Sequence, residues 1–295
     1  MISQFEQYLL AEKRYSPHTV KAYITDLLQF VDFLCLTPDT FCPSEITSHL
    51  VRGWVVVLVK SGMSARTVNR KIAALSTFFI YLKRSGAIQK LPTANVIHPK
   101  QPKRLPTFVG YEEVNRIPKP DDDDFLNLRN ILIVEILYTT GMRRGELVAL
   151  KIEDLDLQSG SLKVLGKGQK ERIIPLIPST KLLINRYISV RQEYFSECGN
   201  TYLFLTSKGE QIYPKLVERV VKELLGEAGV RGKRSPHVLR HTFATHLLDK
   251  GADLLSIKEL LGHNSIGTTQ IYTHNTLEKI KETYMKAHPR ADNNS

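Results

Sequence analysis

Apolar residues recur at helical spacing along the first 95 residues of the chain. Near the start they repeat at i, i+3 and i+4, in Phe5, Tyr8 and Leu9. Ser16-Pro17 is typical of a helix start, with a serine N-cap and a proline at the first helical position, and apolar residues at helical spacing follow over 20–34. We therefore predict a first domain of several helices and no strands over 1–95.

A further helix start near Ser64 brings the first candidate binding residues. Apolar residues between Ile72 and Leu82 form one stripe of this helix, and we expect the basic side chains largely away from it: Arg66, Arg70 and Lys71. A basic helical face is often simply solvated, but it can also contact phosphates. Both interpretations stay open at this point.

A proline-rich stretch follows the helical region. Four prolines and no periodicity between Leu91 and Pro106 predict a basic linker, which we place at 96–109. A second domain is expected over 110–288, and a flexible tail over 289–295.

The second domain is predicted to combine helices with a small hairpin. Residues 161–165 and 172–176 are short β-prone runs on either side of Gly166-Lys167-Gly168, which predicts an antiparallel hairpin with this lysine at its tip. Helices are expected over the segments 125–138, 144–150, 180–194, 213–228, 238–249, 253–261 and 275–286. The predicted fold class is therefore mainly α, with a helical domain followed by an α+β domain.

The composition excludes several classes of protein. Hydrophobic residues make up 42% and charged residues 24%, as in a globular protein, and the longest apolar run, Val55 to Val59, is far too short to span a bilayer. The first residues carry no secretory signal pattern. The three cysteines lack a CxxC motif, which argues against a disulfide framework or a cysteine zinc site. We expect a cytoplasmic protein with no membrane partner.

The positive charge of the chain lies mainly in its first third. The whole chain has a net charge of +11, and residues 1–108 carry 14 basic and 6 acidic side chains, a net charge of +8. A positive field of this kind favours a polyanion, most often nucleic acid, although a merely basic soluble surface is the alternative.

The stretch from Ser235 to His246 carries a candidate anion site. His237 precedes a predicted helix and Arg240 lies in its first turn, where backbone N–H groups and a planar guanidinium suit a phosphate. A zinc site is the rival, because His237 and His241 are spaced as in HExxH, but no glutamate follows His237. For His241 and His246 a structural role is the other interpretation.

Other candidates are weak when each is taken alone. Arg143 stands at a predicted helix start, where Glu146 can orient an arginine or cap the helix. Lys167 is not part of a P-loop. His263 follows a helix-stopping glycine, and Tyr272 comes nine residues later. A phenol with a pKa near ~10 needs cationic surroundings before it can act as a nucleophile.

Taken in order, these residues resemble the signature of the tyrosine recombinases: Arg143, Lys167, His237-x-x-Arg240, His263 and Tyr272. The resemblance includes the 24-residue step from the first arginine to the lysine and the nine-residue step from His263 to Tyr272. The front region, with Ser16-Pro-His-Thr-Val-Lys-Ala-Tyr, resembles the helical, SAM-like core-binding domain of this family. The length, without an extra arm-binding domain, is most similar to the Xer group.

The resemblance implies a site-specific DNA recombinase that needs no metal, ATP or other cofactor. Tyr272 would attack the phosphate and form a 3'-phosphotyrosyl bond, while Arg143 and Arg240 stabilise the pentacoordinate phosphate. Lys167 would protonate the departing 5'-oxygen.

The remaining residues of the signature receive supporting roles from the resemblance. His237 would accept the tyrosine proton or donate to the phosphate, and His263 would donate to a non-bridging oxygen. Glu146 and His241 would support the residues that touch the phosphate.

Recombination between two duplexes needs four active sites, so the implied partners are double-stranded DNA sites and a homotetramer, or a tetramer with a related recombinase. A DNA translocase is a further possible partner. The implied role is Xer-like resolution of chromosome or plasmid dimers. The alternatives are a mobile-element integrase or DNA invertase, a type IB topoisomerase-like activity, and a non-catalytic DNA-binding regulator.

The segment after Tyr272 carries an apolar stripe at helical spacing: Leu277, Ile280, Tyr284 and Met285. This stripe can fold back on its own domain. The resemblance favours packing on a neighbouring subunit instead.

Overall fold

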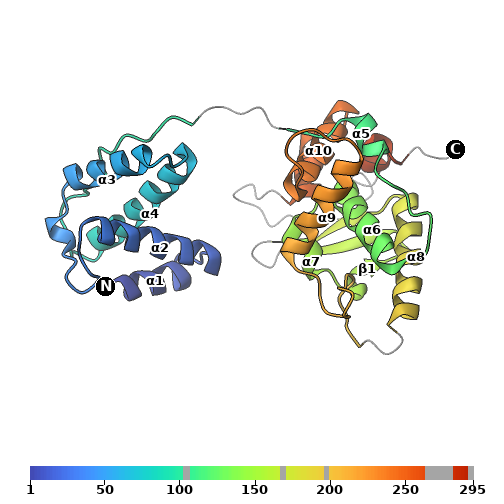
Figure 1. Ribbon diagram of the computed structural model, residues 1–295, viewed down its shortest axis with the longest axis horizontal. Helices are drawn as coiled ribbons and strands as arrows, with labels where there is room; N and C mark the ends of the chain where they lie inside the picture. The colour runs from blue at the N-terminus through green and yellow to red at the C-terminus, as the bar shows by residue number, and fades with distance from the viewer. Residues whose placement is uncertain (102–106, 167–170, 196–198, 263–281, 292–295) are drawn as a thin grey trace. The chain divides into compact units, whose positions relative to one another are not determined.

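The computed structural model describes residues 1–101, 107–166, 171–195, 199–262 and 282–291 (Figure 1). The chain divides into two compact units, Met1–Arg104 and Leu105–Ser295. Helices dominate both units, and the second also holds a small antiparallel sheet. The predicted fold class, mainly α with two domains, is confirmed. The finer boundaries at 95, 109 and 288 stay predictions.

The described part of the first unit consists of helices joined by loops, with no strand. Its elements are α1 (Ile2–Ala11), α2 (Pro17–Phe33), the 3-10 turn η1 (Pro43–Glu45), α3 (Ser48–Lys60) and α4 (Ala65–Arg84). The predicted helix starts are confirmed, because the Ser16 and Ser64 hydroxyls accept hydrogen bonds from backbone N–H groups three residues later. A core of aromatic and aliphatic side chains joins the helices, and its largest members include Phe5, Phe30, Phe78 and Phe79.

One expectation for α4 is wrong. Lys71 does not lie on an exposed basic face: it is only 3% exposed, and its ammonium group donates a 2.9 Å hydrogen bond to Asp26. It also bonds to Gln29 of α2. Arg66 and Arg70 are exposed as expected, and Arg70 pairs with the same Asp26. Asp26 and Gln29 of α2 make the burial of this lysine possible, because a buried ammonium group needs a buried counter-charge.

The end of the first unit is fastened to α4. The Asn69 side-chain amide donates a 3.0 Å hydrogen bond to the carbonyl of Pro99, and its oxygen lies 3.2 Å from Nδ1 of His98. The chain is thus tied to the exposed side of α4 thirty residues after Asn69.

The second unit surrounds one central helix. Its helical elements are α5 (Tyr111–Asn115), α6 (Phe125–Thr140), α7 (Arg144–Ala149), η2 (Ile152–Asp154), α8 (Pro178–Tyr194), α9 (Pro214–Glu227), α10 (Pro236–Asp249) and α11 (Leu254–Leu261). Helix α6 is buried on almost every side, since it packs against α8, α9 and α10 (Figure 1). In the ranges that the structure describes, no helix combines the length and the apolar character of a membrane span.

Within the described residues, the sheet has three antiparallel strands in the order β1 (Leu155–Asp156), β2 (Ser161–Leu165) and β3 (Glu171–Pro175). The predicted pairing of the two longer strands is confirmed, with Leu162 opposite Ile174 and Val164 opposite Arg172. These four residues are buried, so the inward face of β3 contains a charged residue, Arg172, beside its apolar neighbours.

Residues 282–291 pack on their own chain, which is the first of the two alternatives for the tail. Residues 282–287 are helical, and Tyr284 and Ala287 belong to the core of the second unit, 1% and 4% exposed. Beyond them Arg290 pairs with the buried Glu135 of α6. This part of the tail completes the core of its own chain, while Leu277 and Ile280 lie outside the described residues.

Candidate functional site

The first predicted site residue, Arg143, follows a turn that requires glycine. Gly141 ends α6 in the left-handed conformation (φ 59°), and a Cβ atom there would lie 2.4 Å from the ring of Phe243. The turn lets Arg143 stand at the N-terminus of α7. Its backbone N–H donates to Glu146 Oε2 and its Nη1 to Glu146 Oε1, both at 2.8 Å. The prediction that Glu146 orients the arginine and caps the helix matches this geometry.

Arg240, on the first turns of α10, is fixed by two backbone carbonyls. Its Nη1 donates to the Gly141 carbonyl at 2.5 Å and its Nη2 to the Leu261 carbonyl at 2.7 Å. Burial, together with the positive charge of Arg143, lowers the pKa of Arg240 to about 10. The Arg240 guanidinium therefore stays protonated at neutral pH, although it lies near the Arg143 cation in a partly desolvated site.

A third arginine that sequence reasoning missed, Arg172, joins this place. It is 5% exposed, and its Nη1 and Nη2 donate to the two carboxylate oxygens of Glu146 at 3.1 and 2.7 Å. Strand alternation was the available signal, because Arg172 shares the inward register of Ile174. We call Arg143, Arg172, Arg240 and Glu146 the guanidinium cluster.

The guanidinium cluster is organised around the end of α11. Gly262 closes this helix in the left-handed conformation, φ 63°, which leaves the last carbonyl groups without helical partners. The carbonyl of Leu260 accepts from Arg172, that of Leu261 from Arg240, and that of Gly262 from Arg143 at a longer 3.4 Å. Three consecutive carbonyls therefore gather three cations, as expected at the negative end of a helix dipole.

The charge balance of the guanidinium cluster favours an anion. It holds three arginine cations and one carboxylate. A phosphate diester carries one negative charge and can accept two hydrogen bonds from a guanidinium group, so its binding would lower the repulsion among the arginines. The side chain of Arg143 remains 39% exposed and can reach a ligand from solvent. The cluster is chemically suited to bind and stabilise a phosphate.

The predicted histidines separate into exposed and buried positions. His237 is exposed at the start of α10, and His241 is half-buried one residue after Arg240. His246 is 2% exposed, with Nδ1 3.1 Å from the Tyr138 hydroxyl and Tyr111 stacked on its ring at 4.4 Å. Burial lowers the pKa of His246. These contacts favour the structural interpretation of His246.

The zinc alternative gains no support from the described ranges, in which no three His, Cys, Asp or Glu side chains gather closely enough to bind a metal. Three predicted catalytic residues, Lys167, His263 and Tyr272, lie outside the described residues. Their roles therefore rest on the sequence. The roles of Arg66 and Arg70 in DNA contact likewise stay predictions.

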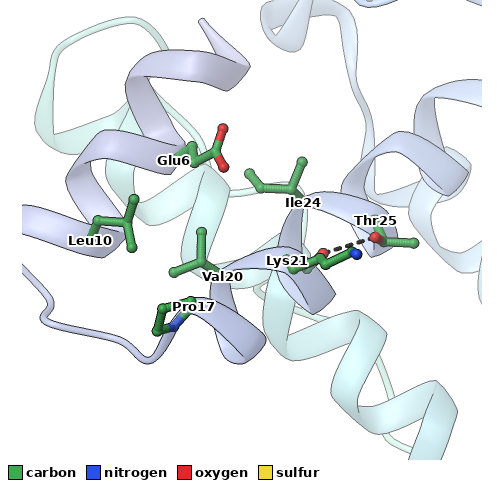
Figure 2. A pocket seen from close by; sticks show the side chains of 7 residues that line it. All are labelled: Glu6, Leu10, Pro17, Val20, Lys21, Ile24 and Thr25. Carbon is green, nitrogen blue, oxygen red and sulfur yellow. Dashed lines mark hydrogen bonds between the residues drawn. The ribbon is translucent and has the colours of Figure 1, made fainter.

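A pocket in the first unit contains none of the predicted site residues. Figure 2 shows that Glu6 and Leu10 of α1 line it together with five residues of α2: Pro17, Val20, Lys21, Ile24 and Thr25. The lining is mostly apolar, with Glu6 and Lys21 as its charged members. It lacks the concentration of cations that distinguishes the guanidinium cluster.

The sequence also matches known families along most of its length. Residues 108–279 match the phage integrase family, and residues 2–86 match the N-terminal SAM-like domain of phage integrases. The chain belongs to the phage integrase family of tyrosine recombinases. Enzymes of this family cut and rejoin DNA through a tyrosine intermediate, and the predicted class, an Xer-like site-specific recombinase, is confirmed.

Several Xer recombinases are similar to this recombinase over nearly its whole length. It is 37% identical to tyrosine recombinase XerC of Chlorobaculum parvum over 98% of this chain and 94% of the relative. It is 38% identical to tyrosine recombinase XerD of Listeria innocua over 99% of both chains. Relatives named XerC and relatives named XerD therefore match this chain about equally well.

Among solved structures, the recombinase is similar to XerH site-specific recombinase in a post-cleavage complex with its palindromic difH substrate. The TM-score is 0.72 and the identity 27%, over 96% of this chain and 83% of that one. The pre-cleavage complex of XerH with difH gives a TM-score of 0.68 at the same identity.

Proposed function

We propose that this recombinase acts on double-stranded DNA at specific sites and resolves chromosome or plasmid dimers, with Tyr272 as its nucleophile. The observation that carries the proposal is the guanidinium cluster, in which Arg143 and Arg240 are oriented by Glu146 and by the end of α11. Near-complete coverage of relatives named XerC and XerD supports the Xer-like role over integration or inversion.

The proposed reaction is an in-line displacement at phosphorus. The Tyr272 oxygen forms a bond to phosphorus as the bond to the 5'-oxygen breaks, giving a 3'-phosphotyrosyl linkage and a free 5'-hydroxyl. Arg143 and Arg240 stabilise the charge on the non-bridging oxygens, and Lys167 supplies the proton to the 5'-oxygen. Attack by a 5'-hydroxyl from the partner duplex reverses these steps, so no cofactor is required.

The proposed roles of the histidines follow from their chemistry near neutral pH. His237, exposed at the start of α10, accepts the Tyr272 proton or donates to the phosphate, and His263 donates to a non-bridging oxygen. His241, beside Arg240, supports this arrangement without touching the phosphate.

Strand exchange between two duplexes requires four such sites. We infer a homotetramer, or a tetramer with a related recombinase, assembled on two DNA sites, with a DNA translocase as a further partner. Chromosome partition at cell division, and hence action in the cytoplasm, is the cellular setting that this role implies.

The proposal is tested with a nicked suicide substrate that traps covalent protein–DNA adducts. The wild-type chain should form a protease-sensitive adduct, and Tyr272→Phe should abolish it while DNA binding stays within a few-fold. The exposed Tyr213→Phe is the matched control and should react as the wild type does. An adduct that persists in Tyr272→Phe contradicts the assignment of the nucleophile.

The biological role is tested by mapping covalent adducts across the genome. Dimer resolution predicts adducts concentrated at one chromosomal site, whereas adducts at the ends of a mobile element contradict it. Relaxation of a plasmid without any recombination site would instead indicate a topoisomerase-like activity.

A further inference from the structure

Arg172 connects the two supports on which the phosphate-binding arginines depend. We propose that Arg172 is a positioning residue for DNA cleavage, which fixes Glu146 and the last turn of α11 so that Arg143 and Arg240 meet the phosphate in the correct geometry. This proposal rests on the proposed function. It concerns a residue outside the signature that the sequence shares with the family.

The first support is Glu146, which both Arg143 and Arg172 use. Its Oε1 accepts from Nη1 of Arg143 at 2.8 Å and from Nη1 of Arg172 at 3.1 Å. Its Oε2 accepts from the Arg143 backbone N–H at 2.8 Å and from Nη2 of Arg172 at 2.7 Å. Arg172 donates one hydrogen bond to each oxygen of Glu146 and so fixes the plane of this carboxylate. That plane sets the direction of the Arg143 side chain.

The second support is the end of α11. Nε of Arg172 donates to the Leu260 carbonyl at 2.9 Å, and the next carbonyl, of Leu261, accepts from Arg240. A shift of this turn therefore moves the acceptor of Arg240 as well. All three nitrogens of the Arg172 guanidinium group are engaged, and they join β3, α7 and α11.

Close packing restricts the Arg172 side chain further. A Cβ atom at Gly262 would lie 3.2 Å from both Cδ and Nη1 of Arg172, so the side chain fits directly against the glycine at the end of α11. The left-handed φ of 63° at this position independently requires glycine. The guanidinium of Arg172 thus has little room to change its orientation.

The charge of Glu146 depends on the same contacts. Burial by itself would raise the pKa of this carboxyl, but hydrogen bonds from Arg172 and then Arg143 outweigh burial and keep the pKa below its usual value. Among the residues that the structure describes, Glu146 faces three cations, Arg143, Arg172 and Arg240. Loss of Arg172 should therefore raise the pKa of Glu146, and protonation would remove an acceptor that orients Arg143.

The test must separate positioning from ordinary structural support by a buried arginine. Arg129 of α6 provides a matched control: it is also 5% exposed, it donates a 3.0 Å hydrogen bond to the Leu205 carbonyl, and it does not contact the guanidinium cluster. Arg172→Ala and Arg129→Ala should both lower the melting temperature. Arg172→Lys keeps the charge but lacks the planar fork, so it retains folding where the alanine variant does not.

The experiment measures single-turnover adduct formation by the full-length chain on the nicked substrate, at saturating protein and over a range of pH. Arg172→Ala and Arg172→Lys should slow cleavage on the order of 10²-fold, the scale of a small misplacement of reacting groups, with DNA affinity nearly unchanged. Their rates should also fall at a higher pH than the wild-type rate as the solution is acidified. Arg129→Ala should keep the wild-type rate and pH profile.

Two outcomes would overturn the positioning role: Arg172→Lys cleaving as fast as the wild type, or Arg129→Ala losing as much rate as an Arg172 variant of equal melting temperature. A wild-type chain that forms no adduct would contradict the proposed function itself. The two failures are therefore distinguishable.

Discussion

The Tyr284 hydroxyl donates a 2.7 Å hydrogen bond to the carbonyl of Thr139, a residue 145 positions earlier in the chain. Thr139 lies in the last turn of α6, where carbonyl groups lack helical partners, so the tail satisfies an acceptor of the central helix. The same helix carries the chain into the Gly141 turn and Arg143. The tail therefore contacts the helix that leads directly to the guanidinium cluster.

Removal of residues 282–295 should destabilise the isolated chain. The deletion removes the buried Tyr284 ring, for which truncation of a comparable aromatic costs about 3–5 kcal/mol, and it leaves Glu135 without Arg290. Chemical denaturation should show a lower free energy of unfolding. An unchanged denaturation midpoint would contradict the assignment of this segment to the core of its own chain.

Tyr284→Phe isolates the hydrogen bond from the packing of the ring. It should cost about 1–3 kcal/mol, because the Thr139 carbonyl loses its donor inside the protein. Tyr213→Phe, at a tyrosine that is 47% exposed, is the control and should leave the free energy of unfolding unchanged. Equal effects of the two variants would show that the hydroxyl contributes nothing specific.

Arg240→Ala should slow cleavage by about 10²-fold or more, the scale for the loss of one preorganised donor to a developing negative charge. EDTA should leave the wild-type rate unchanged. Single-turnover adduct formation measures both effects. A rate that collapses on chelation would revive the metal interpretation of the histidines in α10.

Lys167→Ala should slow cleavage only when the leaving oxygen needs a proton. Replacement of the bridging 5'-oxygen by sulfur provides a much better leaving group, so the thio-substrate should restore the rate of this variant. If the variant cleaves the thio-substrate no faster than normal DNA, another residue supplies the proton.

Lys71 should contribute to the stability of the first unit, whereas Arg66 should contribute to DNA binding, although both belong to α4. Lys71→Met leaves Asp26 without its buried partner and should cost about 3 kcal/mol of unfolding free energy, moderated by the remaining pair with Arg70. Arg66→Ala should weaken binding to DNA of any sequence and reduce the slope of affinity against salt by about 1. Denaturation and salt-dependent fluorescence anisotropy distinguish them, and a binding defect without a stability loss in Lys71→Met would restore Lys71 as a DNA contact.

Much of the fold followed from periodicity and capping. The starts of α2 and α4 were predictable because Ser16 and Ser64 cap them through local hydrogen bonds. The sequence of α3 does not distinguish a buried side from an exposed side. Val56, Val57 and Val59 are exposed although they are as apolar as the residues on its buried side. Strand β1 has only two residues, too few to show alternation.

The candidate site was predictable where residues act in a fixed order along the chain, as Arg143, Glu146 and Arg240 do. The buried cations were not. Arg172 and Lys71 look like surface residues in the sequence, and their burial depends on carboxylates 26 and 45 positions away, Glu146 and Asp26. Alternation along β3 could mark Arg172 as inward-facing, but burial of a cation is costly without a counter-charge, and only the tertiary structure identifies the partners that make it favourable.

The fastening of His98 and Pro99 to Asn69 shortens the tether between the two units. The chain is tied to α4 up to Pro99, and at the other end the Val109 N–H donates a 2.9 Å hydrogen bond to Thr242 of α10. Even fully stretched, the backbone from Pro99 to Val109 spans at most roughly 35 Å. The Asn69 side chain therefore sets where the unanchored part of this connector begins, and an Asn69→Ala change would lengthen that part by releasing His98 and Pro99 from α4.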